Sequence, residues 1–513
     1  MADSSVVDPF LLTPPPIHTE DPGSPPPPAS ILLDRYGYLS CRVNGTTAGG
    51  FTKDGKTILV TFWAATPPRV SCFTVHCPDV KPSASVGLPS ALYSEDDLVL
   101  LRIPIRFQGD LLHADNYQYF VYQAGNVNSP PSLKQLPIPR YVKFSDHELV
   151  LLRRRDDGQD DMFYFAVLHR VIDLEYDGEK FDLYMYNSKT GTWSTEMLLI
   201  DSLNNTHYSY PSIVLAMGGE FGTVGWVDLW RGIIICDVLR DNHTLRYIPL
   251  PPPLVRKRLR GYPMFLRDIV VVGDYIKFFE MSYHVSNTGR IVAAEGLVAA
   301  TKRMKISDIG SGNNCWEEDC TFKFSDIPVD NPKFAGMLRN LKPVKNTELT
   351  LKGLRAGYPA LSLHDADVVC VMHTPDPDKD IALVVALDVR NKTLKDVADF
   401  GSGRPLGYTF TYLQSGISKH LNNWSSFRDL FVTADQTASQ SSPDARAKLH
   451  KVEAAEEGLL LGADAEYNAS QAHRPTPAPT TQHSNPTPAT RAKLGFSPEI
   501  IFLRIKQVSN IIT

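Results

Sequence analysis

Short apolar segments that alternate with polar residues recur between residues 29 and 435. The run Thr57 to Trp63 is rich in β-branched and aromatic residues, and Phe181 to Tyr186 carries large side chains on both faces. Alternation of this kind, bounded by turn residues, is typical of β-strands. The helical period appears over modest stretches such as Lys333 to Leu341. The pattern therefore predicts an all-β, mainly antiparallel fold.

An internal repeat suggests how these strands are arranged. Three segments share an apolar strand, a polar turn around Asn or Asp, and then Thr followed by a large residue, which is Trp193, Leu245 or Leu394. Two looser copies lead to Leu133 and Trp316. These markers recur at irregular intervals somewhat above the roughly 50 residues of a kelch-type blade. Each copy would form the outer hairpin of a four-stranded blade that cannot bury its face alone.

The repeat thus predicts a propeller-like domain of about five or six blades, with an earlier blade beginning near Ile31. Because the intervals are irregular, a pair of β-sandwiches is the alternative architecture.

Composition changes at both ends of this domain. Residues 1–28 contain nine prolines and predict a disordered Pro-rich arm, because proline cannot donate the backbone hydrogen bonds of helices and central strands. Residues 436–495 are rich in Ala, Thr and Pro, which is linker composition. Residues 496–513 form a short apolar tail that could dock back on the domain or bind a partner. The predicted organisation is therefore arm, domain 29–435, linker and tail.

Several segments resemble one protein family. They include Ile31 to Arg35, Pro67 to Ser71, Val75 to Pro78 and, most specifically, Trp226 to Pro251. Together they resemble the plant family called domain of unknown function 1618, which is expanded in grasses, over roughly residues 29–420. The family has no established activity, so the resemblance implies no catalytic residue, cofactor or partner. The signature residues of the most specific block are Trp226, Asp228, Trp230, Arg231 and Gly232.

The signature block itself predicts a hairpin. Strand residues up to Val227 are followed by a turn at Trp230 to Gly232 and a second strand from Ile233. We expect Gly232 to supply a positive φ in that turn. The two tryptophans could offer a stacking surface, but filling a blade core is the favoured interpretation, since aromatic residues dominate burial.

The segment Gly50 to Thr57 satisfies the pattern of a phosphate-binding loop. Such a loop works by opening a helix whose free amides hold the phosphates. Here a strand-like run, Ile58 to Trp63, comes next instead, so Asp54 and Gly55 are interpreted as a hairpin turn. No nucleotide cofactor is predicted.

Seven cysteines do not make a disulfide framework in a chain of 513 residues. The pairs Cys72 with Cys77 and Cys315 with Cys320 have a spacing that zinc tolerates, and His76 lies beside the first pair. Because Cys72 lies in a strand-like run, core packing is the favoured interpretation. Acidic clusters at residues 156–161 and 376–380 lack the ligand spacing of a calcium loop. No metal site is predicted.

The net charge of −5 gives no general attraction to nucleic acid or to an anionic membrane. Residues 1–10 lack a cationic region followed by an apolar core, so we expect a cytoplasmic or nuclear protein. No Gly-x-Ser-x-Gly or His-Glu-x-x-His motif occurs in the sequence. The leading hypothesis is a non-enzymatic scaffold that binds another protein, and the alternative is a hydrolase-type enzyme with a site assembled from propeller loops.

Overall fold

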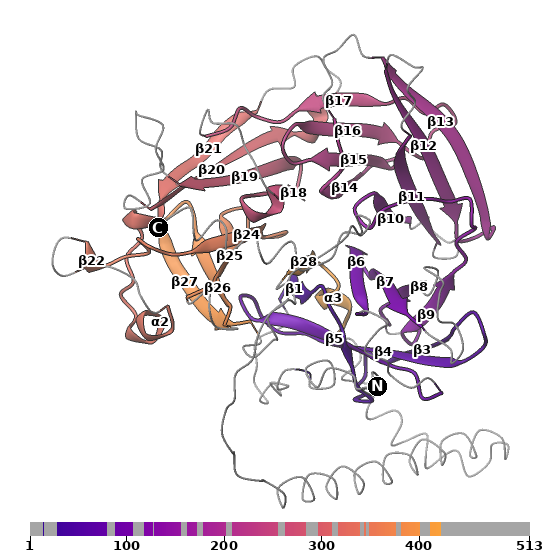
Figure 1. The fold of residues 1–513 in the computed structure, drawn as a ribbon, viewed down its shortest axis with the longest axis horizontal. Coiled ribbons are helices and arrows are strands. Elements are labelled where there is room, and N and C mark those ends of the chain that lie inside the picture. The colour runs from indigo at the N-terminus through magenta and orange to yellow at the C-terminus, as the bar shows by residue number, and fades with distance from the viewer. Residues whose placement is uncertain are drawn as a thin grey trace, which may run out of the picture. The chain divides into compact units, whose positions relative to one another are not determined.

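Six β-sheets form the blades of a ring in the computed structural model of the chain (Figure 1). This confirms the predicted all-β, mainly antiparallel propeller and excludes the sandwich alternative. The propeller has six blades. We refer to the region between the inner strands, along the axis of the ring, as the channel, and side chains cross it. The structure describes residues 14, 28–79, 88–105, 117–126, 128–154, 162–171, 178–201, 208–254, 262–283, 296–309, 316–338, 343–344, 348–375, 381–400 and 411–421. The predicted linker and tail, and the predicted arm apart from residues 14 and 28, lie outside these described residues.

Five blades are four-stranded antiparallel meanders whose first strand is innermost. Blade 2 contains β6 (Ser90–Glu95), β7 (Leu98–Pro104), β8 (Tyr117–Gln123) and β9 (Ser132–Leu136). Blade 3 contains β10 (Leu149–Arg154), β11 (Met162–Val171), β12 (Gly178–Asn187) and β13 (Thr192–Asp201). Blade 4 contains β14 (Ile213–Gly218), β15 (Thr223–Asp228), β16 (Gly232–Asp237) and β17 (Arg246–Pro249). Blade 5 contains β18 (Arg267–Val272), β19 (Tyr275–Tyr283), β20 (Leu297–Lys305) and β21 (Glu317–Lys323), and blade 6 contains β24 (Ala356–Leu361), β25 (Val368–His373), β26 (Leu383–Asp388) and β27 (Thr393–Asp399).

Blade 1 closes the ring by joining the two ends of the described domain. Its strand order is β28 (Tyr412–Ser415), β1 (Ile31–Asp34), β5 (Val70–His76), β4 (Thr57–Trp63) and β3 (Ala48–Phe51), with β2 (Tyr38–Leu39) also paired to β5. The strand β28 pairs antiparallel with β1, so that Ile31 lies opposite Ser415. The ring is therefore closed by backbone hydrogen bonds between strands that are very far apart in sequence.

The repeat predicted from the sequence marks the outer hairpins of blades 2 to 6. Leu133, Trp193 and Leu394 lie in the outermost strands β9, β13 and β27, and Leu245 and Trp316 immediately precede β17 and β21. Two of these markers also tie blades together. The indole of Trp193 donates to the carbonyl of Pro137 at 2.8 Å, and that of Trp316 donates to the carbonyl of Pro249 at 3.0 Å, in each case at the end of the preceding blade.

The few helical elements lie in the connections between strands. The helix α2 (Pro332–Met337) confirms the start of the helix predicted over Lys333 to Leu341, but it ends earlier, at Met337. Pro332 lies in its first turn, and the Asn331 side chain accepts from the Lys333 amide. The other short elements are α3 (Ser418–Leu421), η2 (Pro263–Phe265), η4 (Ile306–Asp308), η5 (Phe324–Asp326) and the β22 (Pro343–Val344) and β23 (Glu348–Leu349) pair. Across the described residues, none of the helices has the length and apolar character needed to cross a membrane.

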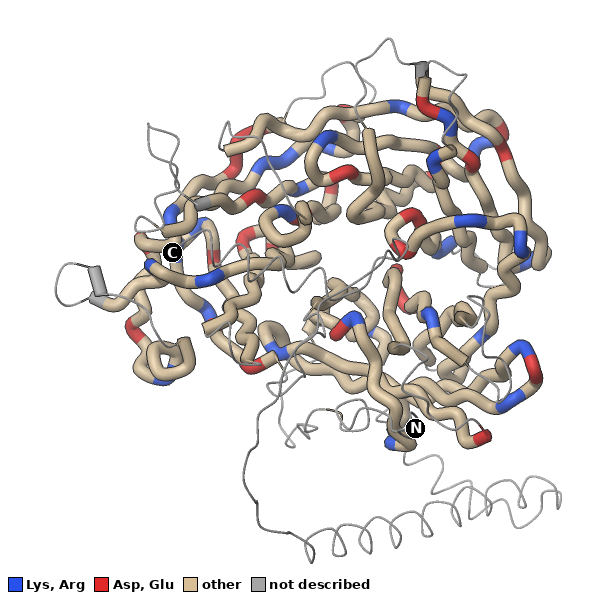
Figure 2. Tube along the Cα trace, in the orientation of Figure 1, with Lys and Arg blue, Asp and Glu red and all other residues tan. Residues whose placement is uncertain are grey.

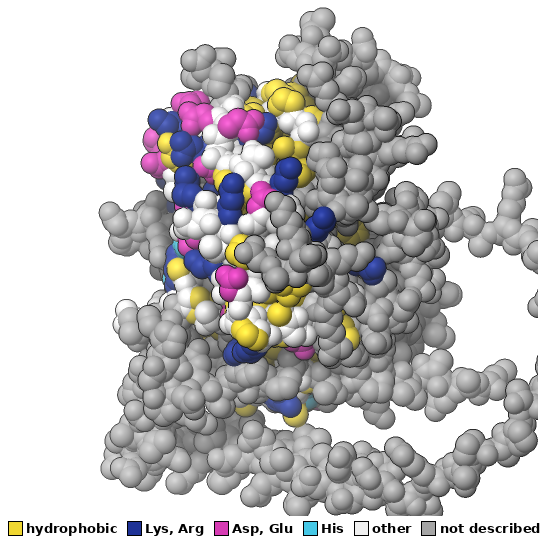
Figure 3. Space-filling model, turned by 90° about the vertical axis from the view of Figure 1, so that its left-hand side faces the viewer, with side chains coloured by type: hydrophobic (Ala, Val, Ile, Leu, Met, Phe, Trp, Pro, Cys, Tyr) yellow, Lys and Arg dark blue, Asp and Glu magenta, His cyan; other side chains and the backbone are white. Residues whose placement is uncertain are grey.

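Charged residues are distributed around the ring rather than gathered on one side. Figure 2 shows basic and acidic residues interspersed along the strands and turns of every blade. On the side presented in Figure 3, the described surface mixes acidic, basic and polar side chains with small hydrophobic areas. This described part of the outer wall has the ordinary mixed character of a solvated surface.

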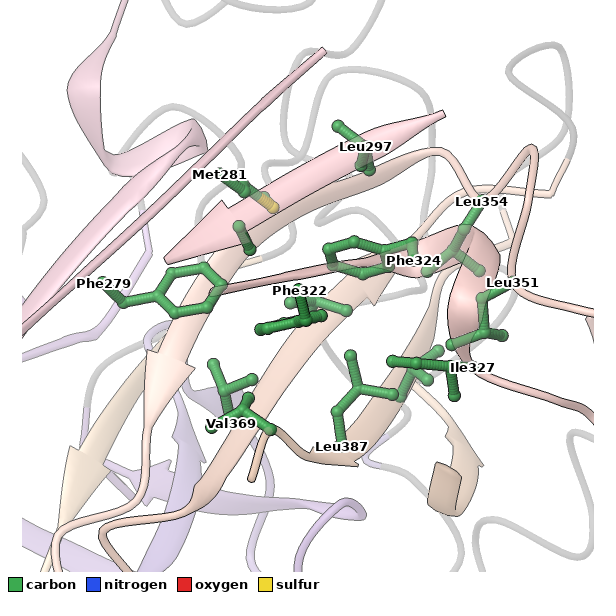
Figure 4. Close-up of a cluster of buried hydrophobic side chains, with 14 of the residues drawn as sticks. Phe279, Met281, Leu297, Phe322, Phe324, Ile327, Leu351, Leu354, Val369 and Leu387 are labelled. Carbon is green, nitrogen blue, oxygen red and sulfur yellow. The ribbon is translucent and has the colours of Figure 1, made fainter. Parts of the chain in front are cut away.

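The hydrophobic core is divided among the six junctions between adjacent blades. The largest cluster lies between blades 5 and 6, where Phe279 and Met281 of β19 face Val369 and Leu387, and Phe324 of η5 packs beside them (Figure 4). The other clusters fill the remaining junctions in the same way. Since each blade buries its two faces only against its neighbours, adjacent blades stabilise one another around the ring.

Candidate functional site at the channel mouth

One face of the ring is where the inner strands of blades 2 to 6 begin. Because each of these strands is the first of an identical meander, their first residues meet at the same end of the channel. The Arg35 amide donates to Thr411 before β28, and the Ala91 amide of β6 donates to the Arg35 carbonyl, so Arg35 lies at this same end. The residues that define the channel mouth are Arg35, Tyr36, His147, Tyr210, Tyr262 and Tyr358.

The tyrosines of the mouth come from different blades and retain solvent exposure. Tyr210 and Tyr262, which precede β14 and β18, are 58% and 41% exposed, and Tyr36 and Tyr358 are partly buried. Phe265 joins two of them, with ring centroids 6.0 Å from Tyr262 and 4.5 Å from Tyr358 in edge-on geometry. Such edge-to-face contacts fix the rings in place while leaving other ring surface open.

A tyrosine–histidine contact crosses the mouth from blade 5 to blade 3. The hydroxyl of Tyr262 lies 3.3 Å from Nε2 of His147. Burial lowers the pKa of His147 to about 3, and the nearby Arg35 and Arg102 guanidiniums act in the same direction. The imidazole is therefore neutral at physiological pH, and Nε2 can accept a hydrogen bond from the Tyr262 hydroxyl.

Tyr358 occupies an unusual backbone conformation. Its φ is 47°, and the pairing of β24 with β25 shifts register between Gly357 and Ala360, which marks a bulge. The Tyr412 hydroxyl donates to the Tyr358 carbonyl at 2.5 Å and holds the bulge against blade 1. A left-handed non-glycine residue at a bulge is costly and is found preferentially at functional sites.

Below the mouth, side chains cross the channel. Asp268 of β18 accepts hydrogen bonds from the Leu361 amide at 2.8 Å and from the Gln414 amide group at 2.9 Å, and thereby joins blades 5, 6 and 1. Its burial raises the pKa to about 7. The hydroxyl of Tyr93 in blade 2 accepts from the Ala216 amide of blade 4 at 3.2 Å. The mouth is therefore underlain by a layer of hydrogen-bonded side chains.

The signature residues predicted from the sequence lie together at the junctions of blade 4, outside the mouth. Trp226 is fully buried and its indole donates to the Glu148 carbonyl of blade 3 at 2.8 Å. Asp228 accepts from the Trp230 amide at 2.9 Å and from the Arg231 guanidinium at 2.9 Å. The Trp230 ring packs under the Arg267 guanidinium of blade 5, 4.7 Å from its centroid. Burial of Trp226 agrees with the predicted core-filling role.

The prediction that Gly232 supplies a positive φ in the turn was wrong. Gly232 begins β16 and is not among the described residues with positive φ. A Cβ atom built on it would instead lie 2.4 Å from the ring of Tyr247 in β17. The glycine is required by close cross-strand packing of an aromatic ring and not by the conformation of the turn.

The segment resembling a phosphate-binding loop forms a β-hairpin, as predicted. The strands β3 and β4 flank a turn in which Gly55 has φ of 73° and the Thr52 amide donates to the Lys56 carbonyl at 2.8 Å. Within this described segment, no helix comes after the turn to supply free amides to a phosphate.

The zinc-like cysteine spacing does not converge on one point. Cys77 packs against the core cluster that contains Phe73 and Val75, whereas Cys72 is buried on the opposite face of β5. Cys315 and the acidic clusters at 156–161 and 376–380 lie outside the described residues. Among the residues that are described, no group of three or more potential ligands is arranged to hold a metal ion.

Sequence reasoning missed the mouth, although a signal was present. The three Tyr-Pro dipeptides of the chain begin at Tyr210, Tyr262 and Tyr358, and each stands at or just before the inner strand of blade 4, 5 or 6. This second repeat places one tyrosine from each of blades 4, 5 and 6 at the same end of the channel. The role of Arg35 and Tyr36 could not be found in that way, since blade 1 is built differently.

Comparisons with known proteins give one informative match. Curated proteins show no sequence match to this chain. Similar solved structures include a GH43_12 protein retrieved from a capybara gut metagenome, with 10% identity over 74% of this chain and 83% of that chain and a TM-score of 0.26. Another is the WD40 domain of SCAP from fission yeast, with 12% identity over 75% of this chain and 91% of that chain and a TM-score of 0.25. Similarity at this level carries no argument about activity or partner.

The sequence match to a family model begins at the signature block and extends into blade 6. Residues 226–370, from Trp226 in β15 to Cys370 in β25, match the family described as a protein of unknown function, DUF1618. The matched segment contains the signature residues of blade 4, all of blade 5 and the first strand of blade 6. Over residues 226–370 the chain is therefore similar to the domain of unknown function 1618 family, as the sequence resemblance predicted.

Proposed function

We propose that this protein is a non-enzymatic scaffold that binds another protein at the channel mouth. The observation that carries the proposal is the gathering of partly exposed tyrosines from blades 1, 5 and 6, namely Tyr36, Tyr262 and Tyr358, around Arg35. Tyrosine and arginine are enriched among the residues that dominate binding energy at protein interfaces. Tyrosine also loses little side-chain entropy on binding, which favours a rigid recognition surface.

The hydrolase alternative has weaker support. Asp268 has a pKa of about 7, which suits a general acid. Its Oδ2 atom, however, already accepts from both Leu361 and Gln414, and the residue is 6% exposed. A catalytic carboxyl needs a free oxygen within reach of substrate. The geometry therefore favours a structural role for Asp268 in joining three blades.

The proposal is tested by removing one mouth tyrosine. Tyr262→Ala removes an exposed ring of the mouth, and Phe221→Ala removes a similarly exposed ring, 38% accessible, in the turn at the opposite end of blade 4. The full chain and both variants are cross-linked in extract of the source organism, and cross-linked peptides are mapped. We expect partner peptides linked near the mouth, with recovery reduced about tenfold or more by Tyr262→Ala and unchanged by Phe221→Ala.

Two results would overturn the proposal. One is equal recovery by Tyr262→Ala and wild type, which would place the interface elsewhere. The other is turnover of a panel of nitrophenyl glycosides and esters by the wild-type chain that disappears in Asp268→Asn, which would favour the hydrolase.

A further inference from the structure

The mouth carries one guanidinium, that of Arg35, for which the described residues provide no paired acid. Three other arginines of the ring are matched to an acid, in the pairs Arg102 with Asp146 at 2.6 Å, Arg231 with Asp228 at 2.9 Å and Arg267 with Glu280 at 2.9 Å. Within the described part of the chain, no carboxylate pairs with the Arg35 guanidinium. Its neighbour Asp34 is buried and accepts from the Tyr36 amide at 3.1 Å and from the Tyr38 hydroxyl at 3.3 Å.

Arg35 lies near the axis of the ring. Its backbone is held between the inner strands β28 and β6. The Arg35 charge lowers the pKa of His147 of blade 3, and it acts in the same direction on Tyr262 and Tyr358 of blades 5 and 6, where burial is the larger, opposing cause. The Arg35 charge therefore acts on groups that come from three other blades.

Two hydroxyls beside this cation are also available. The Tyr262 hydroxyl is directed to His147. The hydroxyls of Tyr36 and Tyr358 make no hydrogen bond to another described residue. Burial raises the pKa of Tyr358, so its phenol stays protonated and can donate. The mouth thus combines one guanidinium with two phenolic donors and open aromatic surface.

We propose that the channel mouth binds a carboxylate of an extended acidic segment of the partner protein, with Arg35 as its cation and Tyr36 and Tyr358 as further donors. This inference rests on the proposed scaffold function and specifies its ligand. A guanidinium matches a carboxylate in charge and in fork geometry. A phosphate carries about −1.5 to −2 charges and is usually bound by a cluster of arginines. The residues that define the mouth include one arginine, Arg35.

The test uses peptides because the partner is unidentified. A displayed library of random dodecapeptides is selected on the full chain, and the most enriched peptide is synthesised together with a version in which Asn and Gln replace Asp and Glu. Affinities are measured by fluorescence anisotropy for the wild type, Arg35→Gln and Arg140→Gln. Arg140 is an arginine in the loop between β9 and β10 and serves as the matched control.

We expect enriched peptides to contain Asp or Glu. The neutral peptide should bind the wild type about tenfold or more weakly than the acidic one, since hydrogen bonds to charged groups are the strong ones. Arg35→Gln should remove that preference, and Arg140→Gln should keep it. The preference should also weaken at high salt.

Other outcomes separate this inference from the scaffold proposal. If Tyr262→Ala abolishes peptide binding but Arg35→Gln leaves the acidic preference intact, the scaffold stands and the carboxylate assignment falls. A phosphoserine peptide that binds tenfold more tightly than its Asp counterpart would also overturn the carboxylate. Selection of no peptide, or binding indifferent to both Tyr262→Ala and Arg35→Gln, would count against both proposals. Matching unfolding curves for all variants exclude misfolding as the cause.

Discussion

Two arginines on the same face of the ring lie in opposite surroundings. Arg267 is 2% exposed, donates to the Leu229 carbonyl at 2.7 Å and to Glu280 at 2.9 Å, and packs against the rings of Trp230 and Phe278. Arg35 is partly exposed and is surrounded by tyrosines, but no described acid pairs with it. The same residue types therefore build a closed junction in one place and an open surface in the other.

The difference separates two roles that sequence patterns confuse. At the junction of blades 4 and 5, the aromatic rings and charged groups contact one another. Packing, hydrogen bonds and an ion pair within the ring account for the signature residues there. At the mouth, the tyrosine rings stay partly exposed, and the hydroxyls of Tyr36 and Tyr358 make no hydrogen bond to a described residue. A family signature can therefore mark the scaffold, while the residues that favour recognition lie outside it.

The largest expected effect concerns the closed junction. Arg267→Gln leaves the buried Glu280 carboxylate without its cation and should lower the free energy of unfolding by about 3–5 kcal/mol. Urea unfolding followed by tryptophan fluorescence measures the change. The double variant Arg267→Met with Glu280→Leu removes both charges and should lose less. A loss below about 1 kcal/mol in the single variant would contradict a structural role for this pair.

Asp268 stands next to Arg267 in β18 but belongs to the layer under the mouth, and its effect should depend on pH. Its folded-state pKa of about 7 exceeds the ordinary aspartate value of 3.8. Between these values the folded protein keeps a proton that the unfolded chain has lost, so stability falls as pH rises from about 4 to 7. The slope from this group is at most about 1.4 kcal/mol per pH unit.

Asp268→Asn should remove that part of the slope, so its stability relative to the wild type should rise from pH 4 to pH 8. Glu95, with a pKa also of about 7, contributes a separate slope that Glu95→Gln should remove. Urea midpoints measured at each pH give the comparison. An unchanged slope in Asp268→Asn would mean that the carboxylate is charged in the folded protein.

A smaller effect is expected at Gly232. Gly232→Ala drives a methyl group into the Tyr247 ring and should cost about 1–3 kcal/mol, the usual range for overpacking. The shorter side chain in Gly232→Ala with Tyr247→Leu should recover much of this loss. If no substitution at Tyr247 gave recovery, backbone conformation and not packing would be the reason for the glycine.

How much of the fold was accessible from the sequence depends on the range of the contacts. Hairpins are local, so the markers from Leu133 to Leu394 identified the outer strands and the fold correctly. Ring closure by β28 and β1 depends on pairing between residues such as Ile31 and Ser415, which no local pattern reveals. The reason for Gly232 likewise depended on the partner strand.

The candidate site was hidden for the same reason. Arg35, His147, Tyr262 and Tyr358 are far apart in sequence, and each alone is an ordinary loop or strand residue. Only the ring brings them to one end of the channel. The Tyr-Pro repeat identifies part of that set, because it recurs once in each of blades 4, 5 and 6. Blades 1, 2 and 3 lack it, and blade 1 supplies the cation.

The smallest effect on stability should come from Arg35, and it bears most directly on the comparison. No described acid pairs with the Arg35 guanidinium, so Arg35→Gln breaks no ion pair among the described residues. Arg102 acts on His147 in the same direction as Arg35 and remains in the variant. Arg35→Gln should therefore change the free energy of unfolding by less than about 0.5 kcal/mol. Measured beside Arg267→Gln under identical conditions, it compares the same substitution in a closed and an open environment. A loss above about 1 kcal/mol would show that Arg35 also holds blades together, and the contrast between junction and mouth would fail. Near-neutrality would instead leave a central cation that contributes little to folding, as expected of a residue whose partner is another molecule.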